Sequence, residues 1–241
     1  MNRYRPLDNV RIVLSHTSHP GNIGAAARAL KTMGLSSLYL INPRSFPDKE
    51  AEARAANAKD ILDNVRVCAN INDALDGTAL AAAISARPRG LSHDVYDSRQ
   101  GAQEIIGYAR ENPVALVFGA ESSGLTTMEV GKCHITIHIP ADPDYSSLNL
   151  ASAVQVMSYE LRMALPEIEQ HAQQSSNLAS FNDVELFFRH LEQVMIASKF
   201  LNPEKPKRLM QRVRRLFSRA RLEKGEVKFL RGFLSALDKM K

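Results

Sequence analysis

The order of apolar and polar residues predicts alternating strands and helices over the first two thirds of the chain. Short, almost continuously apolar runs are typical of buried strands, and apolar residues at helical spacing indicate amphipathic helices. The expected strands are residues 10–15, 37–41, 65–69, 80–85, 114–118 and 133–139. The expected helices are residues 22–34, 51–62, a short one that ends at Gly77, 98–111 and 149–165.

Strands of this kind, separated by helices, predict an α/β fold with a mostly parallel sheet covered on both faces. Ligands of such sheets bind in the loops beyond the carboxyl ends of the strands. We therefore expect a functional site in the loops at residues 16–22, 86–98, 119–125 and 140–150.

The last third of the chain has a different pattern. Residues 166–181 are polar and rich in Gln and Ser, which predicts a linker. Amphipathic runs at residues 181–200, 207–222 and 226–240 predict three helices. The expected organisation is a domain over residues 1–165, a linker over 166–181 and a small helical extension over 182–241.

Positive charge is concentrated in that extension. The whole chain has a formal net charge of +5. Residues 199–231 contain twelve Lys and Arg against three Glu, a net charge of +9, whereas residues 1–198 contain seventeen Lys and Arg against twenty-two Asp and Glu, a net charge of −5. Such asymmetry predicts a polyanionic partner. A membrane surface is disfavoured because the apolar residues of this segment are needed for its own packing.

Other features of the sequence point to the cytoplasm. No apolar run reaches the ~18 residues that a membrane-spanning helix needs, and the polar N-terminus lacks a signal-peptide pattern. The two cysteines, Cys68 and Cys133, each lie in a strand-like run. We expect both to be buried, reduced thiols.

Common nucleotide and metal signatures are missing. Gly21 and Gly24 have the wrong spacing for a dinucleotide-binding turn, and the second strand ends at Asn42, where that fold requires an acidic residue. The chain has no Walker A sequence. His16 and His19 have a metal-like spacing, but no nearby Cys or Asp completes a site, so no metal is predicted.

Three strand-end segments contain a set of motifs in a fixed order. They are residues 19–29 (HPGNIGAAARA), residues 117–125 (VFGAESSGL) and residues 139–151 (IPADPDYSSLNLA). Together they resemble the three motifs of the SPOUT RNA ribose methyltransferases, and the resemblance continues through the basic C-terminal helices. Within that superfamily, the chain is most similar to bacterial enzymes that 2′-O-methylate cytidine or uridine at position 32 of the tRNA anticodon loop.

The resemblance implies a C-terminal trefoil knot in the sheet domain and S-adenosyl-L-methionine (SAM) as methyl donor. It also implies tRNA as a partner and a homodimer whose active site draws on both subunits, with helix 149–165 at the interface. Two rival interpretations are a ribose methyltransferase for another tRNA position or for ribosomal RNA, and a non-catalytic RNA-binding protein. Ribosomal relatives commonly have an extra N-terminal domain, for which a first strand near Val10 leaves no room. The preference between cytidine and uridine stays open.

By this resemblance, the catalytic or RNA-positioning residues are Asn22, Arg28, Glu121, Ser147 and Asn149. The ribose hydroxyl has to be deprotonated and held in line with the methyl group. Arg28 is implied as the hydroxyl-activating group. A guanidinium is normally protonated, so a phosphate-clamping or charge-stabilising role is an equal alternative. Glu121 would orient Arg28 or organise its loop, and Ser147 and Asn149 are also good helix caps.

The resemblance also implies positions that hold the cofactor. They are Ile84, Ser85, Ala86, Gly119, Ile139, Ser146, Ser147 and Leu148. The adenine is expected to be held mainly by backbone amides and carbonyls. Ala83 and Ile84 stand where close relatives have a Gly-Thr pair, and Ala120 replaces a bulky residue, so the resemblance implies no side-chain role at Ile84 or Ala120.

The basic helical segment 205–221 is the expected tRNA-binding element. Arg208, Arg212, Arg215 and Arg219 form one stripe, Arg214 and Arg221 lie beside it, and Leu209, Val213, Leu216 and Phe217 form an opposing apolar face. Arginines that contact phosphates give affinity and salt dependence more than a choice of sequence.

Overall fold

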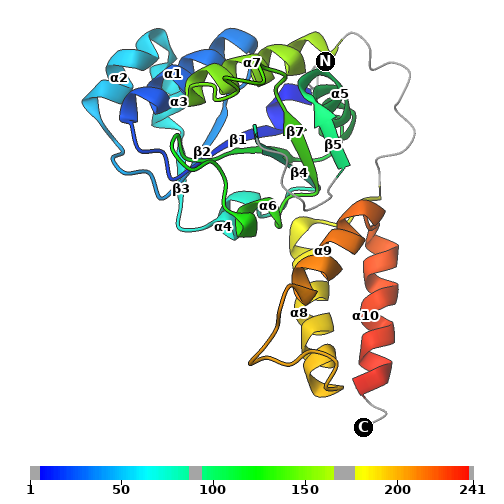
Figure 1. Cartoon of the computed structure of the whole chain (residues 1–241). Coiled ribbons are helices and arrows are strands. Elements are labelled where there is room, and N and C mark those ends of the chain that lie inside the picture. Colours follow the sequence, from blue (N-terminus) through cyan, green and yellow to red (C-terminus); the bar gives the residue numbers. More distant parts are fainter. Residues whose placement is uncertain (1–5, 87–93, 166–176, 239–241) are drawn as a thin grey trace.

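The sheet at the centre of the N-terminal part of this computed structural model has seven strands. Figure 1 shows the helices that pack around it. The structure describes residues 6–86, 94–165 and 177–238. The strands are β1 (Val10–Ser15), β2 (Ser37–Ile41), β3 (Arg66–Cys68), β4 (Leu80–Ile84), β5 (Asp94–Asp97), β6 (Val114–Phe118) and β7 (Ile135–His138). Their order is β3-β2-β1-β6-β4-β7-β5, and each neighbouring pair is parallel. The predicted parallel α/β sheet is confirmed.

Alternate residues of the strands β1, β2, β4 and β6 pack into two separate cores. Ile12 and Leu14 of β1 belong to the first core, whereas Val13 belongs to the second. The first is covered by α1 (Pro20–Met33), α2 (Lys49–Ala55), α3 (Lys59–Asp63), α5 (Ser98–Ala109) and α7 (Leu150–Met163), and the second by α4 (Ile71–Leu75) and α6 (Thr127–Val130). Because both faces are covered, these four strands are mostly apolar along their length, which is why they were recognisable in the sequence.

The prediction of a loop over residues 86–98 is wrong at β5. This strand has the sequence DVYD, lies at the edge of the sheet and pairs with β7. An edge strand is covered on fewer sides than a central one, so a short, mixed sequence suffices and leaves no apolar run to detect. The short helix α6 was also not predicted.

The prediction of one helix over residues 51–62 is wrong as well. The chain forms α2, a 3₁₀ turn (Ala56–Ala58) and α3. Ala56 has a left-handed φ of 50°, which ends α2. Lys31 of α1 holds the turn, since its ammonium donates to the Asn57 carbonyl oxygen and to an Asp60 carboxylate oxygen, both at 2.7 Å. Because these contacts come from another helix, the spacing of apolar residues within 51–62 could not predict them.

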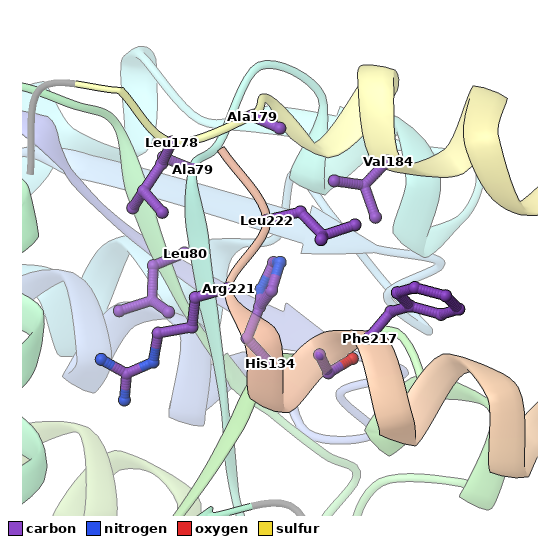
Figure 2. Close-up of a pocket in the computed structure, with 10 residues that line it drawn as sticks. Ala79, Leu80, His134, Leu178, Ala179, Val184, Phe217, Arg221 and Leu222 are labelled. Carbon is purple, nitrogen blue, oxygen red and sulfur yellow. The ribbon is translucent and has the colours of Figure 1, made fainter. Parts of the chain in front are cut away.

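Three helices form a C-terminal helical unit, which comprises residues 177–238 of the described chain (Figure 1). They are α8 (Phe181–Ala197), α9 (Leu209–Ala220) and α10 (Lys224–Asp238), and they share a core that includes Phe187, Phe188 and Leu234. Most of the predicted linker, residues 166–176, lies outside the described residues. A small cavity lies where the unit meets the start of β4, with Leu80, Phe217 and Arg221 among its lining residues (Figure 2).

Two further expectations can be compared with the structure. Cys68 and Cys133 are free and buried, as expected, and burial raises the pKa of each thiol. Within the described residues, every helix is too short or too polar to cross a bilayer.

Gly24 allows α1 and α2 to approach each other closely. A Cβ atom at residue 24 would lie 2.0 Å from the carbonyl oxygen of Ala51. Overpacking of this kind usually costs ~1–3 kcal/mol, and a backbone obstacle cannot rotate away, so we expect Gly24→Ala to lower the free energy of unfolding by at least that amount.

Gly107→Ala in α5 is the matched control, because a Cβ there meets no described atom within 4 Å. Alanine should raise the free energy of unfolding by ~0.5–1 kcal/mol at that helical position. Urea denaturation measures both changes, and equal stability of Gly24→Ala and the wild type would contradict the close approach.

Candidate active site

The carboxyl ends of β4, β6 and β7 border an open cleft, which we call the strand-end cleft. Its empty volume is about 980 Å³. It is lined by Ile84, Ser85 and Ala86, by residues 118–124, by Ile139, by Ser146, Ser147 and Leu148, and by Leu150 and Ala153. All eight positions expected to hold the cofactor lie on this surface. The parallel sheet therefore gathers three segments that are far apart in the sequence.

The loop after β6 is shaped by two glycines. A Cβ atom at Gly119 would lie 2.1 Å from both the carbonyl carbon of Gly124 and the nitrogen of Leu125, so only glycine fits there. The loop folds back on itself through a hydrogen bond from the Gly124 N–H to the Ala120 carbonyl oxygen (2.8 Å), with a left-handed φ of 67° at Gly124. This tight turn places Glu121 opposite the loop after β1.

Glu121 is the centre of a hydrogen-bond network between these two loops. Its carboxylate accepts bonds from the Ser18 N–H (2.9 Å), the Ser18 hydroxyl (2.8 Å), the His19 N–H (3.3 Å) and the Asn22 amide (2.8 Å). Partial burial alone would raise the pKa of Glu121, but the bonds from Ser18 and Asn22 outweigh it and lower the pKa to about 2. The carboxylate is thus charged and its acceptor sites are occupied.

Asn22 and Asn149 extend this network to the third segment. The Asn149 amide nitrogen donates to the Asn22 side-chain oxygen at 3.0 Å. The Asn149 side-chain oxygen in turn accepts bonds from the N–H groups of Ala151 (2.9 Å) and Ser152 (3.3 Å), and so caps α7. A single chain of contacts from Glu121 through Asn22 to Asn149 therefore links the three motif segments. The capping role expected of Asn149 is confirmed.

Arg28 is set apart from the cleft lining, on the surface of α1. It lies exposed on α1, is not among the residues that line the strand-end cleft, and forms no hydrogen bond or ion pair with the described residues. The hydrogen bonds that Glu121 accepts come from Ser18, His19 and Asn22 and not from Arg28. The alternative, that Glu121 organises its loop, agrees with the geometry.

The segment that contains Ser146 and Ser147 forms one rim of the cleft. Residues 141–149 are all exposed, including two large apolar side chains, Tyr145 and Leu148. Ser147 lines the cleft but, unlike Asn149, does not cap α7. This rim thus presents apolar and hydroxyl groups that a bound molecule or a second chain can cover.

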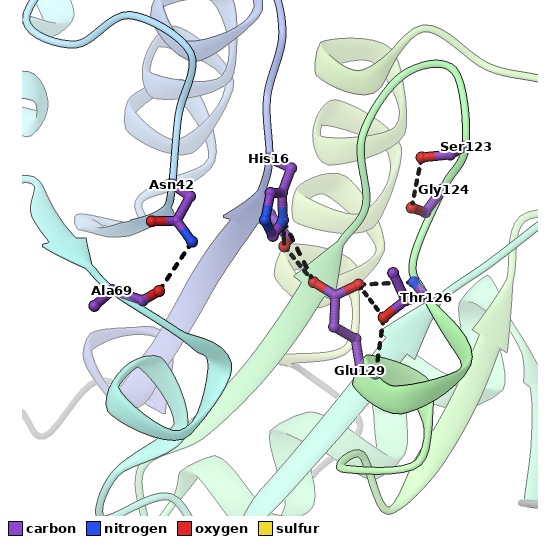
Figure 3. A network of polar contacts seen from close by, with 8 residues as sticks. His16, Asn42, Ala69, Ser123, Gly124, Thr126 and Glu129 are labelled. Atoms are coloured by element: carbon purple, nitrogen blue, oxygen red, sulfur yellow. Dashed lines mark hydrogen bonds and ion pairs between the residues drawn. The ribbon is translucent and has the colours of Figure 1, made fainter.

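A buried carboxylate, Glu129, was missed in the sequence. Its side chain accepts bonds from the Ser15 hydroxyl at the end of β1 and from the Thr126 N–H (2.7 Å) and hydroxyl (2.8 Å), with His16 nearby (Figure 3). The T-x-x-E pattern of residues 126–129 is a helix capping box and was a detectable signal. The partner Ser15 was not detectable, because it comes from a distant strand. Glu129 fixes the base of the loop that presents Glu121.

The metal candidates of the sequence do not gather into a site. His19 lies 3.8 Å from Glu50, and His16 lies 3.8 Å from Glu129. Among the described residues, no group of three or more His, Cys, Asp or Glu side chains is arranged to hold a metal ion.

The arginine-rich helix α9 presents its stripe outward. Arg208, Arg212 and Arg219 are exposed, and Arg215 is half-buried. The opposing face packs through Val213 and Phe217, and the Phe217 ring lies 4.8 Å from that of Phe187. Leu216 was expected on this face, but it is 56% exposed, because the apolar face of α9 that packs against the other helices is too narrow to include it.

Comparison with known protein families agrees with this geometry. Residues 9–159 match the family described as SpoU rRNA Methylase family. Residues 182–241 match the family described as tRNA methyltransferase TrmJ, C-terminal domain. The two matches divide the chain between the sheet domain and the C-terminal helical unit.

Individual relatives are similar over nearly the whole chain. The chain is 44% identical to the tRNA (cytidine/uridine/adenosine-2′-O-)-methyltransferase TrmJ of Pseudomonas aeruginosa (strain UCBPP-PA14), over 97% of this chain and 95% of that protein. It is also 44% identical to the tRNA (cytidine/uridine-2′-O-)-methyltransferase TrmJ of Escherichia coli (strain K12), over 96% of each chain. The crystal structure of TrmJ from Z. mobilis ZM4 matches with a TM-score of 0.85 and 31% identity, over 95% of this chain and 98% of that one. The chain therefore belongs to the SpoU methylase family and, within it, to the group with a TrmJ C-terminal domain.

Proposed function

We propose that this protein is a cytoplasmic, SAM-dependent tRNA 2′-O-methyltransferase that modifies cytidine or uridine at position 32 of the anticodon loop. The relatives from E. coli and P. aeruginosa are named as tRNA 2′-O-methyltransferases. The observation that carries the proposal is the chain of contacts from Glu121 through Asn22 to Asn149 beside the strand-end cleft. It joins, in one site, the three segments that resemble the methyltransferase motifs.

The strand-end cleft suits SAM in size and in chemistry. Its lining is dominated by small residues such as Ser85, Ala86 and Gly119, which leave backbone groups accessible to an adenine and a ribose. Ile84, Ile139 and Leu148 supply apolar surface. Pockets for molecules of this size commonly combine apolar walls with a few polar groups. When bound, SAM supplies an electrophilic methyl group on its sulfonium, and the residues of the chain have to hold the ribose hydroxyl in line with it.

Glu121 is unsuited to be the base that deprotonates the ribose hydroxyl. A general base needs a pKa close to the working pH, and it has to reach the proton that it removes. The pKa of Glu121 is about 2, and its oxygens already accept four hydrogen bonds. We therefore assign it a positioning role, in which it fixes Asn22 and the loop after β1.

For Arg28, we favour a role in binding phosphate or stabilising the developing oxyanion. Its side chain is exposed to solvent on α1. A guanidinium in water keeps its proton, so base catalysis would require an environment that the single chain does not provide. Ser147, which lines the cleft, and Asn149, which caps α7, are proposed to contact the substrate or SAM.

A homodimer explains the apolar groups that surround this site. Leu148 next to the cleft and Tyr159 and Met163 on α7 are exposed in the single chain. Exposed apolar patches of this kind mark interaction surfaces. We propose that α7 and the rim pack against a second copy, which brings its own RNA-binding residues near the cleft. The trefoil knot stays a prediction from the resemblance.

The C-terminal helical unit is proposed to hold the tRNA. The positive charge of the stripe of Arg208, Arg212, Arg215 and Arg219 is complementary to the negative phosphate backbone. Contacts of this kind weaken as salt is added. The match of this unit to the TrmJ C-terminal domain favours tRNA over ribosomal RNA as substrate.

The substrate is tested by incubating the full-length protein with SAM and tRNA transcripts that carry cytidine, uridine or adenosine at position 32. Adenosine is included because the P. aeruginosa relative is named for all three nucleosides. We expect one ribose methyl group per tRNA that carries cytidine or uridine at position 32, mapped to that position by mass spectrometry. The absence of transfer to any tRNA by folded protein would refute the enzymatic proposal, and transfer to another position would refute the assigned site.

The role of Arg28 is tested by Arg28→Ala. We expect methyl transfer to fall by at least ~10²-fold, the usual loss when one stabilising group is removed from a transition state, while the SAM dissociation constant changes little. Lys59→Ala is the matched control, since Lys59 is an exposed cation on α3. Single-turnover kinetics and calorimetric SAM titration provide the two readouts. Unchanged methyl transfer in Arg28→Ala would remove Arg28 from the catalytic site.

A further inference from the structure

Arg221 differs from the arginines of the stripe in the direction of its side chain. It follows the last turn of α9 with a left-handed φ of 48°, so the chain reverses there and leads to the buried Leu222. Figure 2 shows Arg221 and Phe217 extending in opposite directions from the end of α9. Phe217 packs within the C-terminal helical unit, whereas Arg221 leaves it.

The guanidinium of Arg221 reaches the sheet domain and contacts three side chains there. It forms an ion pair with Glu104 of α5 and donates hydrogen bonds to the hydroxyl of Tyr108 (2.8 Å) and to that of Tyr96 in β5 (2.9 Å). The guanidinium carbon also lies 5.5 Å from the centre of the Tyr108 ring. The ion pair is only about one quarter exposed, with Arg221 at 25% and Glu104 at 26%. Partly buried pairs are screened less by salt than surface pairs.

A second set of contacts fixes the same unit nearby. The N–H of Phe181 donates to the carbonyl oxygen of Thr78 at 2.7 Å, just before β4, and the Phe181 ring is buried in the second core of the sheet. Glu185 of α8 accepts bonds from Lys132 of the sheet domain and from Arg214 of α9. Arg214 is thus also directed inward, away from the phosphates that its position beside the stripe suggested.

These contacts connect the arginine stripe to the strand-end cleft through rigid elements. Tyr96 lies in β5, which is paired with β7, and the residue after β7, Ile139, lines the cleft. At the other end, Arg221 is two residues from Arg219 of the stripe. An element whose place is fixed by an ion pair and hydrogen bonds holds its ligand at a set distance from the site of reaction.

We propose that Arg221 is a positioning residue that docks the C-terminal helical unit on the sheet domain, so that tRNA held by the stripe is presented to the cleft in one orientation. The inference rests on the proposed function. In this arrangement, the outward arginines bind the tRNA, and Arg221 keeps the helical unit in the position that places the bound tRNA at the cleft. Loss of Arg221 would leave tRNA affinity but lower turnover.

Arg221→Met tests this division, since methionine keeps an aliphatic chain but no charge. In the full-length protein, we expect the tRNA dissociation constant to stay within about twofold of wild type, because the stripe is intact, and kcat at saturating tRNA to fall about tenfold or more, because misplacement by ~1 Å can cost ~10²-fold. Arg212→Met should instead raise the tRNA dissociation constant. Arg99→Met is the matched control, because it removes an exposed arginine of α5 whose ion pair with Glu160, at 3.5 Å, contributes little.

Glu104→Gln removes the charge of the partner of Arg221 and thus tests the same ion pair. It replaces Arg221→Met as the test if that variant does not fold. It should lower kcat as Arg221→Met does, and the double variant should be no worse than either single one, because the two residues act as a pair. Hydrogen exchange at the Phe181 amide, which bonds across the junction, should be faster in all three variants.

A kcat within twofold of wild type in both single variants, or losses that multiply in the double variant, would overturn the positioning role. If the wild type transfers no methyl group to tRNA, the proposed function has failed instead. The exchange rate at Phe181 then still decides whether Arg221 docks the unit.

Discussion

The carboxylate of Glu121 is the interaction on which the site depends. Four donors from residues 18–22 converge on it, and one of them, Asn22, passes the contact on to Asn149 at the start of α7. Glu121 lies in the loop after β6, Asn22 in the first turn of α1, and Asn149 at the N-cap of α7. The parallel sheet brings them to one edge, but the charged carboxylate determines how they lie relative to one another, and thus the shape of the cleft beside them.

Much of the sheet domain could be predicted from the sequence, because strands buried on both faces are apolar throughout. The residues of the cleft were found through their resemblance to known motifs, and the structure brings them together. The predictions that were wrong concern features that depend on residues distant in the sequence. β5 needs only β7 beside it, the break at Ala56 is held by Lys31, and Arg221 faces Glu104 more than one hundred residues away. Local pattern contains no signal for such contacts.

The basic segment illustrates why a count of charges does not determine their roles. Six arginines lie within residues 208–221, and the sequence placed all of them on or beside one stripe. In the structure, Arg214 and Arg221 turn inward to Glu185 and Glu104, where they hold the helices together and to the sheet. Arg208, Arg212 and Arg219 are exposed, so one short segment combines docking with the proposed binding of tRNA.

The charge of Glu121 can be tested by its effect on stability. Its pKa is about 2 in the folded protein and 4.5 for an ordinary glutamate, so charge-dependent stability is present above pH 4.5 and is lost as the pH falls towards 2. The measurement is the difference in free energy of unfolding between wild type and Glu121→Gln, from urea denaturation between pH 7 and pH 3. We predict that the wild type is more stable at pH 7 and that its advantage shrinks below pH 4.5. A difference that stays constant with pH, or that is zero at pH 7, would contradict the role of the charged carboxylate.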